Sequence, residues 1–93
     1  MRFEWDAVKA ASNLKKHGVS FEEATEVFYD PCALEGLDSV HSTQETRFFI
    51  IGYSSSRLLF VTYIESAENK VRIISARKAN KAERETYERR DSE

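Results

Sequence analysis

The sequence predicts an α+β fold in which helices and strands are segregated along the chain. Three stretches rich in β-branched and aromatic residues follow one another between residues 46 and 77, separated by short polar turns. Strands joined by turns this short must pair antiparallel. Two helical patterns precede these strands and one follows them. We therefore expect two N-terminal helices and a C-terminal helix packed on one face of a small antiparallel sheet.

The size and composition indicate one soluble domain. The chain has 93 residues, of which 41% are hydrophobic and 32% charged, so we expect a single domain over residues 1–93 with one modest core. One cysteine, Cys32, excludes an internal disulfide and suits a reducing compartment. No signal-peptide pattern and no stretch of membrane-spanning length is present. We expect a cytoplasmic protein that does not enter a membrane.

The N-terminal part predicts a short edge strand and two helices. Residues 2–5 alternate polar and apolar side chains, as a strand does. Asp6 suits the N-cap of a helix that runs to His17, and Gly18 suits the position after it. A second helix follows, with Ser20 and Glu23 as a capping box, and residues 30–31 end it. The apolar side of the first helix comprises Ala7, Val8, Ala10, Ala11 and Leu14, and that of the second comprises Phe21, Ala24, Val27 and Phe28.

The rest of the chain predicts the sheet and the last helix. Residues 32–43 are polar and acidic, and indicate irregular structure or a weak strand. Strands are expected over residues 46–53, 57–65 and 71–77, with turns at 54–56 and 66–69. Asn80 and Glu83 form a second predicted capping box, for a helix from Lys81 to about Arg90.

Charge is distributed unevenly along the chain. The formal net charge is −2. Residues 22–45 contain seven acidic residues and no Lys or Arg, whereas residues 70–90 contain eight basic and three acidic residues, a net charge of +5. A dipolar domain of this kind can present a cationic face to phosphate although its overall charge is negative.

Three groups of residues could carry chemistry, and each also has an ordinary structural interpretation. The first is Lys16 and His17 at the end of the first helix. The helix dipole favours cations there. An imidazole in this place suits a general acid or a phosphate ligand, but basic residues are also common at helix ends.

The second group is Glu45 and Arg47. On a strand their spacing of two places them on one face, where they could act as a base and a phosphate clamp, or merely form a surface ion pair. A metal site built from His17, His41, Asp38 and Glu45 lacks a closely spaced ligand pair, so we expect no metal.

The third group is Arg72 and Arg77. They are five residues apart and therefore point to opposite faces of a regular strand. If both serve one site, the strand must bend, bulge or end before Arg77. Otherwise Arg72 lies on the solvated face and Arg77 is a cation at the strand end.

Several sequence blocks occur together, in one order, over nearly the whole chain. They are Phe3-Glu4-Trp5-Asp6, residues 13–24, Val27-Phe28, Asp30-Pro31, Asp38 with His41-Ser42, Glu45 and Arg47, and residues 72–79 followed by Glu83-Arg84 and Tyr87. In these blocks the chain resembles the BrnT family of ribonuclease toxins from type II toxin–antitoxin systems. The closest block is Arg72-Ile73-Ile74-Ser75-Ala76-Arg77-Lys78-Ala79.

The resemblance implies a RelE-like fold and RNA cleavage without a metal or other cofactor. It also implies neutralisation by a cognate BrnA-like antitoxin, in a higher-order complex that represses its own operon. The active-site positions that it implies are Lys16, His17, Glu45, Arg47, Arg72 and Arg77, and we expect the neighbouring Lys70, Lys78 and Lys81 to bind RNA. Many family members have a basic residue where this chain has Ser66, so one phosphate contact would be lost here.

The predicted activity is attack of an RNA 2′-hydroxyl on the adjacent phosphate. This reaction needs a base, an acid and cations around the phosphorane. Glu45 or His17 would be the base or the acid, and Lys16 and the three arginines would stabilise charge. The alternative is a non-catalytic binding module that partners a DNA-binding repressor.

Overall fold

The computed structural model describes residues 1–40 and 44–91. The elements in chain order are β1 (Arg2–Glu4), α1 (Ala7–His17), α2 (Phe21–Glu26), the 3-10 turn η1 (Val27–Tyr29), β2 (Leu34–Leu37), β3 (Phe48–Tyr53), β4 (Leu58–Ala67), β5 (Lys70–Lys78) and α3 (Lys81–Asp91). The predicted α+β class is confirmed. Among the described residues, no helix is long and apolar enough to cross a membrane.

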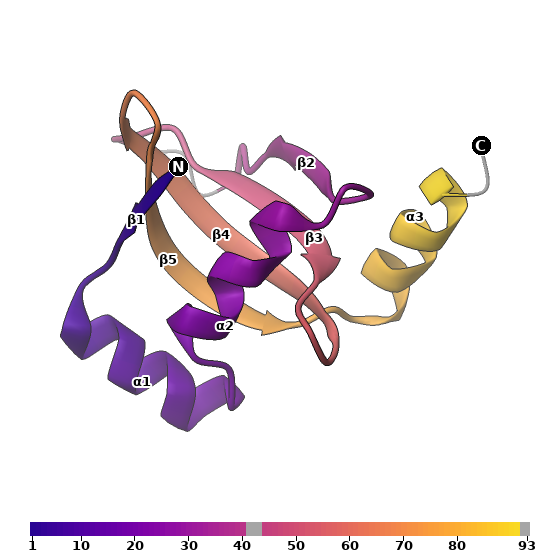
Figure 1. Cartoon of the computed structure of the whole chain (residues 1–93), viewed down its shortest axis with the longest axis horizontal. Coiled ribbons are helices and arrows are strands. Elements are labelled where there is room, and N and C mark those ends of the chain that lie inside the picture. The colour runs from indigo at the N-terminus through magenta and orange to yellow at the C-terminus, as the bar shows by residue number, and fades with distance from the viewer. Residues whose placement is uncertain (41–43, 92–93) are drawn as a thin grey trace.

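The five strands form one mixed sheet. Their order is β1-β5-β4-β3-β2 (Figure 1). Neighbouring strands are antiparallel except for β1, which pairs parallel with β5 through Arg2–Lys70 to Glu4–Arg72. The prediction of an antiparallel sheet is therefore wrong for β1. Nearly the whole chain joins β1 to β5, so no short turn forces that pair antiparallel.

Helices cover both faces of the sheet, at different places. The larger core cluster contains Phe21 and Val27 from the α2 region together with Ile50 of β3. The neighbouring residue Ile51 points to the opposite face, where it packs with Tyr87 of α3. In Figure 1, α2 crosses in front of the sheet whereas α3 lies beyond the end of β3. The prediction that all three helices pack on one face is thus wrong, because alternation along β3 leaves a second apolar patch for α3 to cover.

The orientation of α1 also differs from the prediction. Its partly buried or buried side consists of Ala10, Asn13 and His17, while Val8 and Leu14 are exposed. Ala7 and Ala11 are exposed as well. Hydrogen bonds made by the buried amide of Asn13 set this orientation, as described below, and they outweigh the apolar pattern.

A bulge in β5 decides which of its side chains share a face. Thr62 of β4 is the register partner of Ser75, but the next residue, Tyr63, is the partner of Ile73. Ile74 is therefore the extra residue of a β-bulge. Ile73 and Ala76, three residues apart, both reach the larger core cluster. Arg72 and Arg77 consequently both point to the face opposite α2. The sequence allowed this arrangement only if the strand bends, bulges or ends before Arg77.

Local capping follows the sequence closely. Asp6 accepts hydrogen bonds from the amides of Val8 and Lys9, and Gly18 ends α1 with φ +70°. The Asn80–Glu83 capping box is confirmed, since each side chain accepts from the other residue's amide at 2.8 and 2.9 Å. The Ser20 box is half formed. Ser20 Oγ accepts from the Glu23 amide, but the Glu23 carboxylate binds Arg57 of the β3–β4 turn.

Candidate active site

Two adjacent hollows lie along the second half of β5. The first, which we call the arginine hollow, has a volume of about 400 Å³ and is lined by Asp38, Val40, Arg47, Phe60, Thr62 and Arg77, together with Ile74 and Ser75. The second, the histidine hollow, has a volume of about 220 Å³ and is lined by Lys9, Ser12, Asn13, Lys16 and His17, together with the same Ile74 and Ser75. The bulge at Ile74 thus forms the border between them.

Asn13 brings the end of α1 to this border. Its Nδ2 donates to the carbonyl of Val19 at 2.9 Å and to that of Ala76 at 2.8 Å, and its Oδ1 accepts from the Ala76 amide at 3.1 Å. Strand β1 pairs with β5 only as far as Arg72, so this edge of β5 has no neighbouring strand at Ala76. The side-chain amide of Asn13 makes the hydrogen bonds to Ala76 that a neighbouring strand would otherwise make. Lys16 and His17, one turn further along α1, consequently lie beside Ser75.

Arg77 is fixed on the other side of the border. Its guanidinium lies 4.4 Å from the centre of the Phe60 ring and makes two parallel hydrogen bonds of 2.8 Å to the carboxylate of Glu83 in α3. These bonds raise the pKa of Arg77. Burial alone would raise the pKa of Glu83, but the bonds from Arg77 and Asn80 hold it below its ordinary value. Both groups therefore stay charged. Through Glu83, α3 is bound to Arg77, which lines the arginine hollow.

Arg47 lines the arginine hollow, but its predicted relation to Glu45 is wrong. Strand β3 begins at Phe48, so neither residue lies in a strand and the rule of alternate faces does not apply to them. Glu45 lies in an exposed bend and does not line either hollow. His41 lies outside the described residues. Among those described, no three His, Cys, Asp or Glu side chains are grouped to hold a metal ion.

Arg72 and Lys70 lie at the other end of β5, bound to Glu4 of β1. The Arg72 Nε and the Lys70 Nζ each lie 3.0 Å from a carboxylate oxygen of Glu4. Hydrogen bonds from Lys70 and then Arg72 lower the pKa of Glu4 to about 2. The bulge places Arg72 on the correct face, but neither residue lines the two hollows.

The remaining predicted RNA-binding lysines also lie outside the two hollows. Lys78 follows Arg77 directly in β5 and points to the opposite face. Lys81 is exposed at the start of α3. The structure thus places Lys16 and His17 in one hollow and Arg47 and Arg77 in the adjoining one, and leaves the other predicted site residues elsewhere.

The sequence prediction missed two hydroxyl groups on the floor of the arginine hollow. Thr62 and Ser75 are register partners on β4 and β5, and Thr62 is only 7% exposed. Within residues 1–40 and 44–91, neither hydroxyl has a hydrogen-bond partner, so both can donate to a bound group. Thr62 could have been noticed as a polar residue between Val61 and Tyr63 in an otherwise apolar strand.

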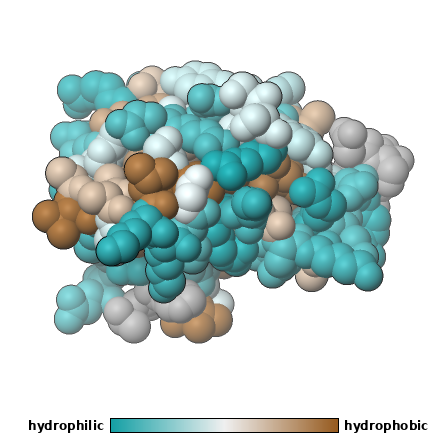
Figure 2. Space-filling view, turned by 90° about the horizontal axis from the view of Figure 1, so that it is seen from below, coloured by the Kyte–Doolittle hydropathy of each residue, from teal (hydrophilic) through white to brown (hydrophobic). Residues whose placement is uncertain are grey.

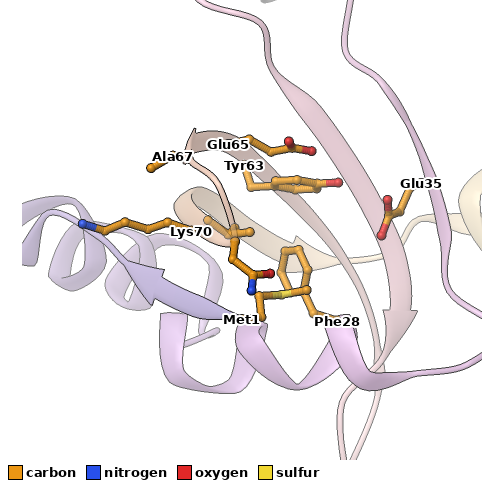
Figure 3. Close-up of a pocket in the computed structure, with 9 residues that line it drawn as sticks. Met1, Phe28, Glu35, Tyr63, Glu65, Ala67 and Lys70 are labelled. Carbon is orange, nitrogen blue, oxygen red and sulfur yellow. The ribbon is translucent and has the colours of Figure 1, made fainter.

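A third cavity, on the opposite face of the sheet, is lined by two carboxylates and, among the described residues, by no arginine. Figure 3 shows Phe28 and Tyr63 in its wall, with the carboxylates of Glu35 and Glu65 on either side. Burial and the nearby Glu35 raise the pKa of Tyr63, so the phenol keeps its proton. Lys70 and the N-terminal residue Met1 also line it. The cationic hollows along β5 are therefore the candidate site.

Comparison with known proteins gives the family. Residues 5–83 match the family model described as "Ribonuclease toxin, BrnT, of type II toxin-antitoxin system". The fold is similar to the crystal structure of the Brucella abortus ribonuclease toxin BrnT, with a TM-score of 0.66 and 24% sequence identity, over 87% of this chain and 99% of that one. The curated proteins contain no match. Since the family model covers most of the chain, the resemblance seen in the sequence is confirmed: the chain belongs to the BrnT family of ribonuclease toxins of type II toxin–antitoxin systems.

Proposed function

We propose that this chain is an endoribonuclease that cleaves RNA without a metal ion, by attack of a 2′-hydroxyl on the adjacent phosphate. The observation that supports it is the border at Ser75. There the hollow lined by an imidazole and an ammonium from α1 adjoins the hollow lined by the guanidiniums of Arg47 and Arg77. A phosphate placed over Ser75 would have a proton-transfer group on one side and fixed positive charge on the other.

The chemistry needs each of these groups. A base removes the proton of the 2′-hydroxyl, whose oxygen attacks the phosphorus and forms a phosphorane. The bond to the 5′-oxygen then breaks, and an acid protonates that oxygen. The products are a 2′,3′-cyclic phosphate and a 5′-hydroxyl. We assign His17 to one proton transfer and Lys16, Arg47 and Arg77 to stabilising the phosphorane. Glu45 is the second candidate for proton transfer.

Arg77 keeps donors for a substrate despite its ion pair. A guanidinium has five N–H groups, and the bonds to Glu83 and to the Lys78 carbonyl use three of them. Arg72, in contrast, serves to hold β1, so we do not assign it to the phosphate. We further propose that a BrnA-like antitoxin neutralises the enzyme in a higher-order complex in the cytoplasm, and that the fold relates to RelE-type toxins.

The alternative is a binding module without catalysis, and one observation favours it. Arg77 forms an ion pair with Glu83 and lies over the ring of Phe60, as arginines with a structural role do. A chain of this kind would bind RNA or a repressor through the same cations but leave the RNA intact.

Incubation of the purified chain with naked RNA in excess EDTA distinguishes the two functions. We expect cleavage products that end in a 2′,3′-cyclic phosphate, and a loss of at least about 100-fold in the Lys16→Ala variant. Lys81→Ala is the matched control, since Lys81 is an exposed lysine outside both hollows. Cleavage that requires added divalent ions would contradict the mechanism, and binding of intact RNA would support the alternative.

A further inference from the structure

The outward side of α1 carries an apolar stripe that is exposed to solvent. Val8 is 79% exposed and Leu14 is 51% exposed. Two exposed alanines, Ala7 and Ala11, complete the stripe, which we call the α1 stripe. In Figure 2, hydrophobic side chains gather at the left of the face shown, over α1. None of these four residues lines the histidine or the arginine hollow.

The spacing of the α1 stripe is that of a docking surface. Positions 7, 8, 11 and 14 lie on one side of a helix with 3.6 residues per turn. The side that contacts β5, through Ala10 and Asn13, is the neighbouring one. Single exposed apolar residues are common, but a continuous stripe marks an interaction site. Anchors spaced in this way are how one amphipathic helix binds another.

Charge indicates what kind of partner the stripe accepts. The eleven residues of α1 include Lys9, Lys15 and Lys16 and no Asp or Glu. Lys15 continues the stripe one turn after Ala11. A second copy of the chain would bring lysines against lysines, which opposes association. A partner with acidic residues would gain attraction instead. The chain belongs to a toxin–antitoxin family, so the partner protein to be considered is an antitoxin.

We propose that the antitoxin binds the α1 stripe through an amphipathic helix. Its apolar side would lie on Val8, Ala11 and Leu14, and its acidic residues would lie beside Lys15. The inference rests on membership of the family and not on the proposed RNA chemistry. Because the stripe lies outside the hollows, substitutions in it separate antitoxin binding from cleavage.

The test uses the full chain and the antitoxin purified from the same operon, with affinity measured by titration calorimetry. Leu14→Gln should weaken binding at least tenfold, and Val8→Glu more, because it adds repulsion to the loss of apolar contact. Both substitutions suit a helix, since glutamine and glutamate are good helix formers and an acid is favourable in the first turn. The matched control is Leu37→Gln, which changes another exposed leucine, 56% exposed, on β2 and should leave the affinity unchanged.

Two outcomes would overturn the inference. One is unchanged affinity for the antitoxin in both α1 variants. The other is a dimer of the chain alone, seen by sedimentation, that Leu14→Gln dissociates. RNA cleavage is assayed in parallel. If the wild-type chain does not cleave RNA but Leu14→Gln still weakens antitoxin binding, the proposed chemistry fails while the docking surface stands.

Discussion

Arg77 shows how one side chain can serve both the site and the fold. Its guanidinium borders the arginine hollow and at the same time joins β5 to α3 through Glu83. From the sequence it would be a cation at a strand end, whose loss hardly affects stability. The bidentate pair with Glu83 changes that expectation, because a partly buried carboxylate would lose its partner.

Arg77→Ala should therefore lower both activity and stability. We expect a 10²- to 10³-fold loss of RNA cleavage, by analogy with removal of an oxyanion donor, and a loss of about 1–3 kcal/mol in the free energy of unfolding. Glu83→Gln is the control, since it weakens the same ion pair but leaves the guanidinium in place. It should lose stability and keep cleavage, as measured by denaturant unfolding and an RNA assay. Equal losses of cleavage in the two variants would show that Arg77 acts only by holding α3.

Asn13 is a positioning residue that no charge or motif argument singled out. Asn13→Ala leaves the amide and the carbonyl of Ala76 without their side-chain partner in a buried place. Each unsatisfied group costs about 1–3 kcal/mol, so we expect a marked fall in the melting temperature. Cleavage should fall further than stability explains, because His17 is no longer held beside Ser75. Ala11→Gln, on the same helix, exposed and outside both hollows, should change neither quantity, because glutamine is also a good helix former.

Among the elements, β1 is joined to β5 by the ion pairs of one carboxylate in addition to strand pairing. Glu4 lies between Lys70 and Arg72, and these cations lower its pKa from 4.5 to about 2. A group with a lowered pKa in the folded state stabilises the fold above its unfolded pKa, and this contribution is lost as the pH falls through the folded value. The attachment of β1 should thus be complete above pH 4.5 and weaken progressively towards pH 2.

Nuclear magnetic resonance titration of the Glu4 carboxyl group checks this expectation. The group should titrate near pH 2, and protection of the β1 amides should fall with it. Glu4→Gln should show weak protection of β1 at every pH, whereas Glu22→Gln, at an exposed site in α2, should behave as the wild type. A Glu4 carboxyl group that titrates near 4.5 would contradict the ion pairs.

At the scale of the whole molecule, the cavities on the two faces of the sheet differ in the charged residues that line them. The carboxylates of Glu35 and Glu65 line the cavity on one face, and Lys16, Arg47 and Arg77 line the hollows along the other. This arrangement lets a chain with a net charge of −2 offer a cationic surface to RNA.

The salt dependence of RNA binding should show how many cations of the chain contact phosphate groups. The three cations assigned to the phosphate, Lys16, Arg47 and Arg77, predict a slope of about −2 for the logarithm of affinity against the logarithm of salt concentration, from about −0.7 per contact on a single strand. A 2′-O-methyl oligonucleotide, which cannot be cleaved, allows the measurement with the wild-type chain. A slope near −5 would mean that Arg72 and the three lysines predicted from the sequence also contact phosphate, contrary to their places in the structure.

Much of the secondary structure and the family could be obtained from the sequence, because both depend on local patterns. The caps at Asp6 and Asn80 use residues two or three positions apart, and the strands from Phe48 to Lys78 follow from β-branched runs and short turns. The blocks that carry the family resemblance are likewise contiguous. Of the predicted site residues, Lys16 and His17 line the histidine hollow and Arg47 and Arg77 line the arginine hollow, and their catalytic roles stay a prediction.

Other features depend on contacts between distant residues. Alternation along a strand holds only while pairing is regular, and the bulge at Ile74, which β4 imposes, reverses the face of Arg77 relative to the simple count. The apolar pattern of α1 predicts one buried side. Asn13 donates two hydrogen bonds and accepts a third, with Val19 and with Ala76 63 positions away, and these bonds bury another side of the helix. Glu4 likewise draws Arg72 away from the hollow through an ion pair across 68 positions. Register, helix orientation and the choice of ionic partner are set by long-range packing, and for that reason they appear only once the chain is folded.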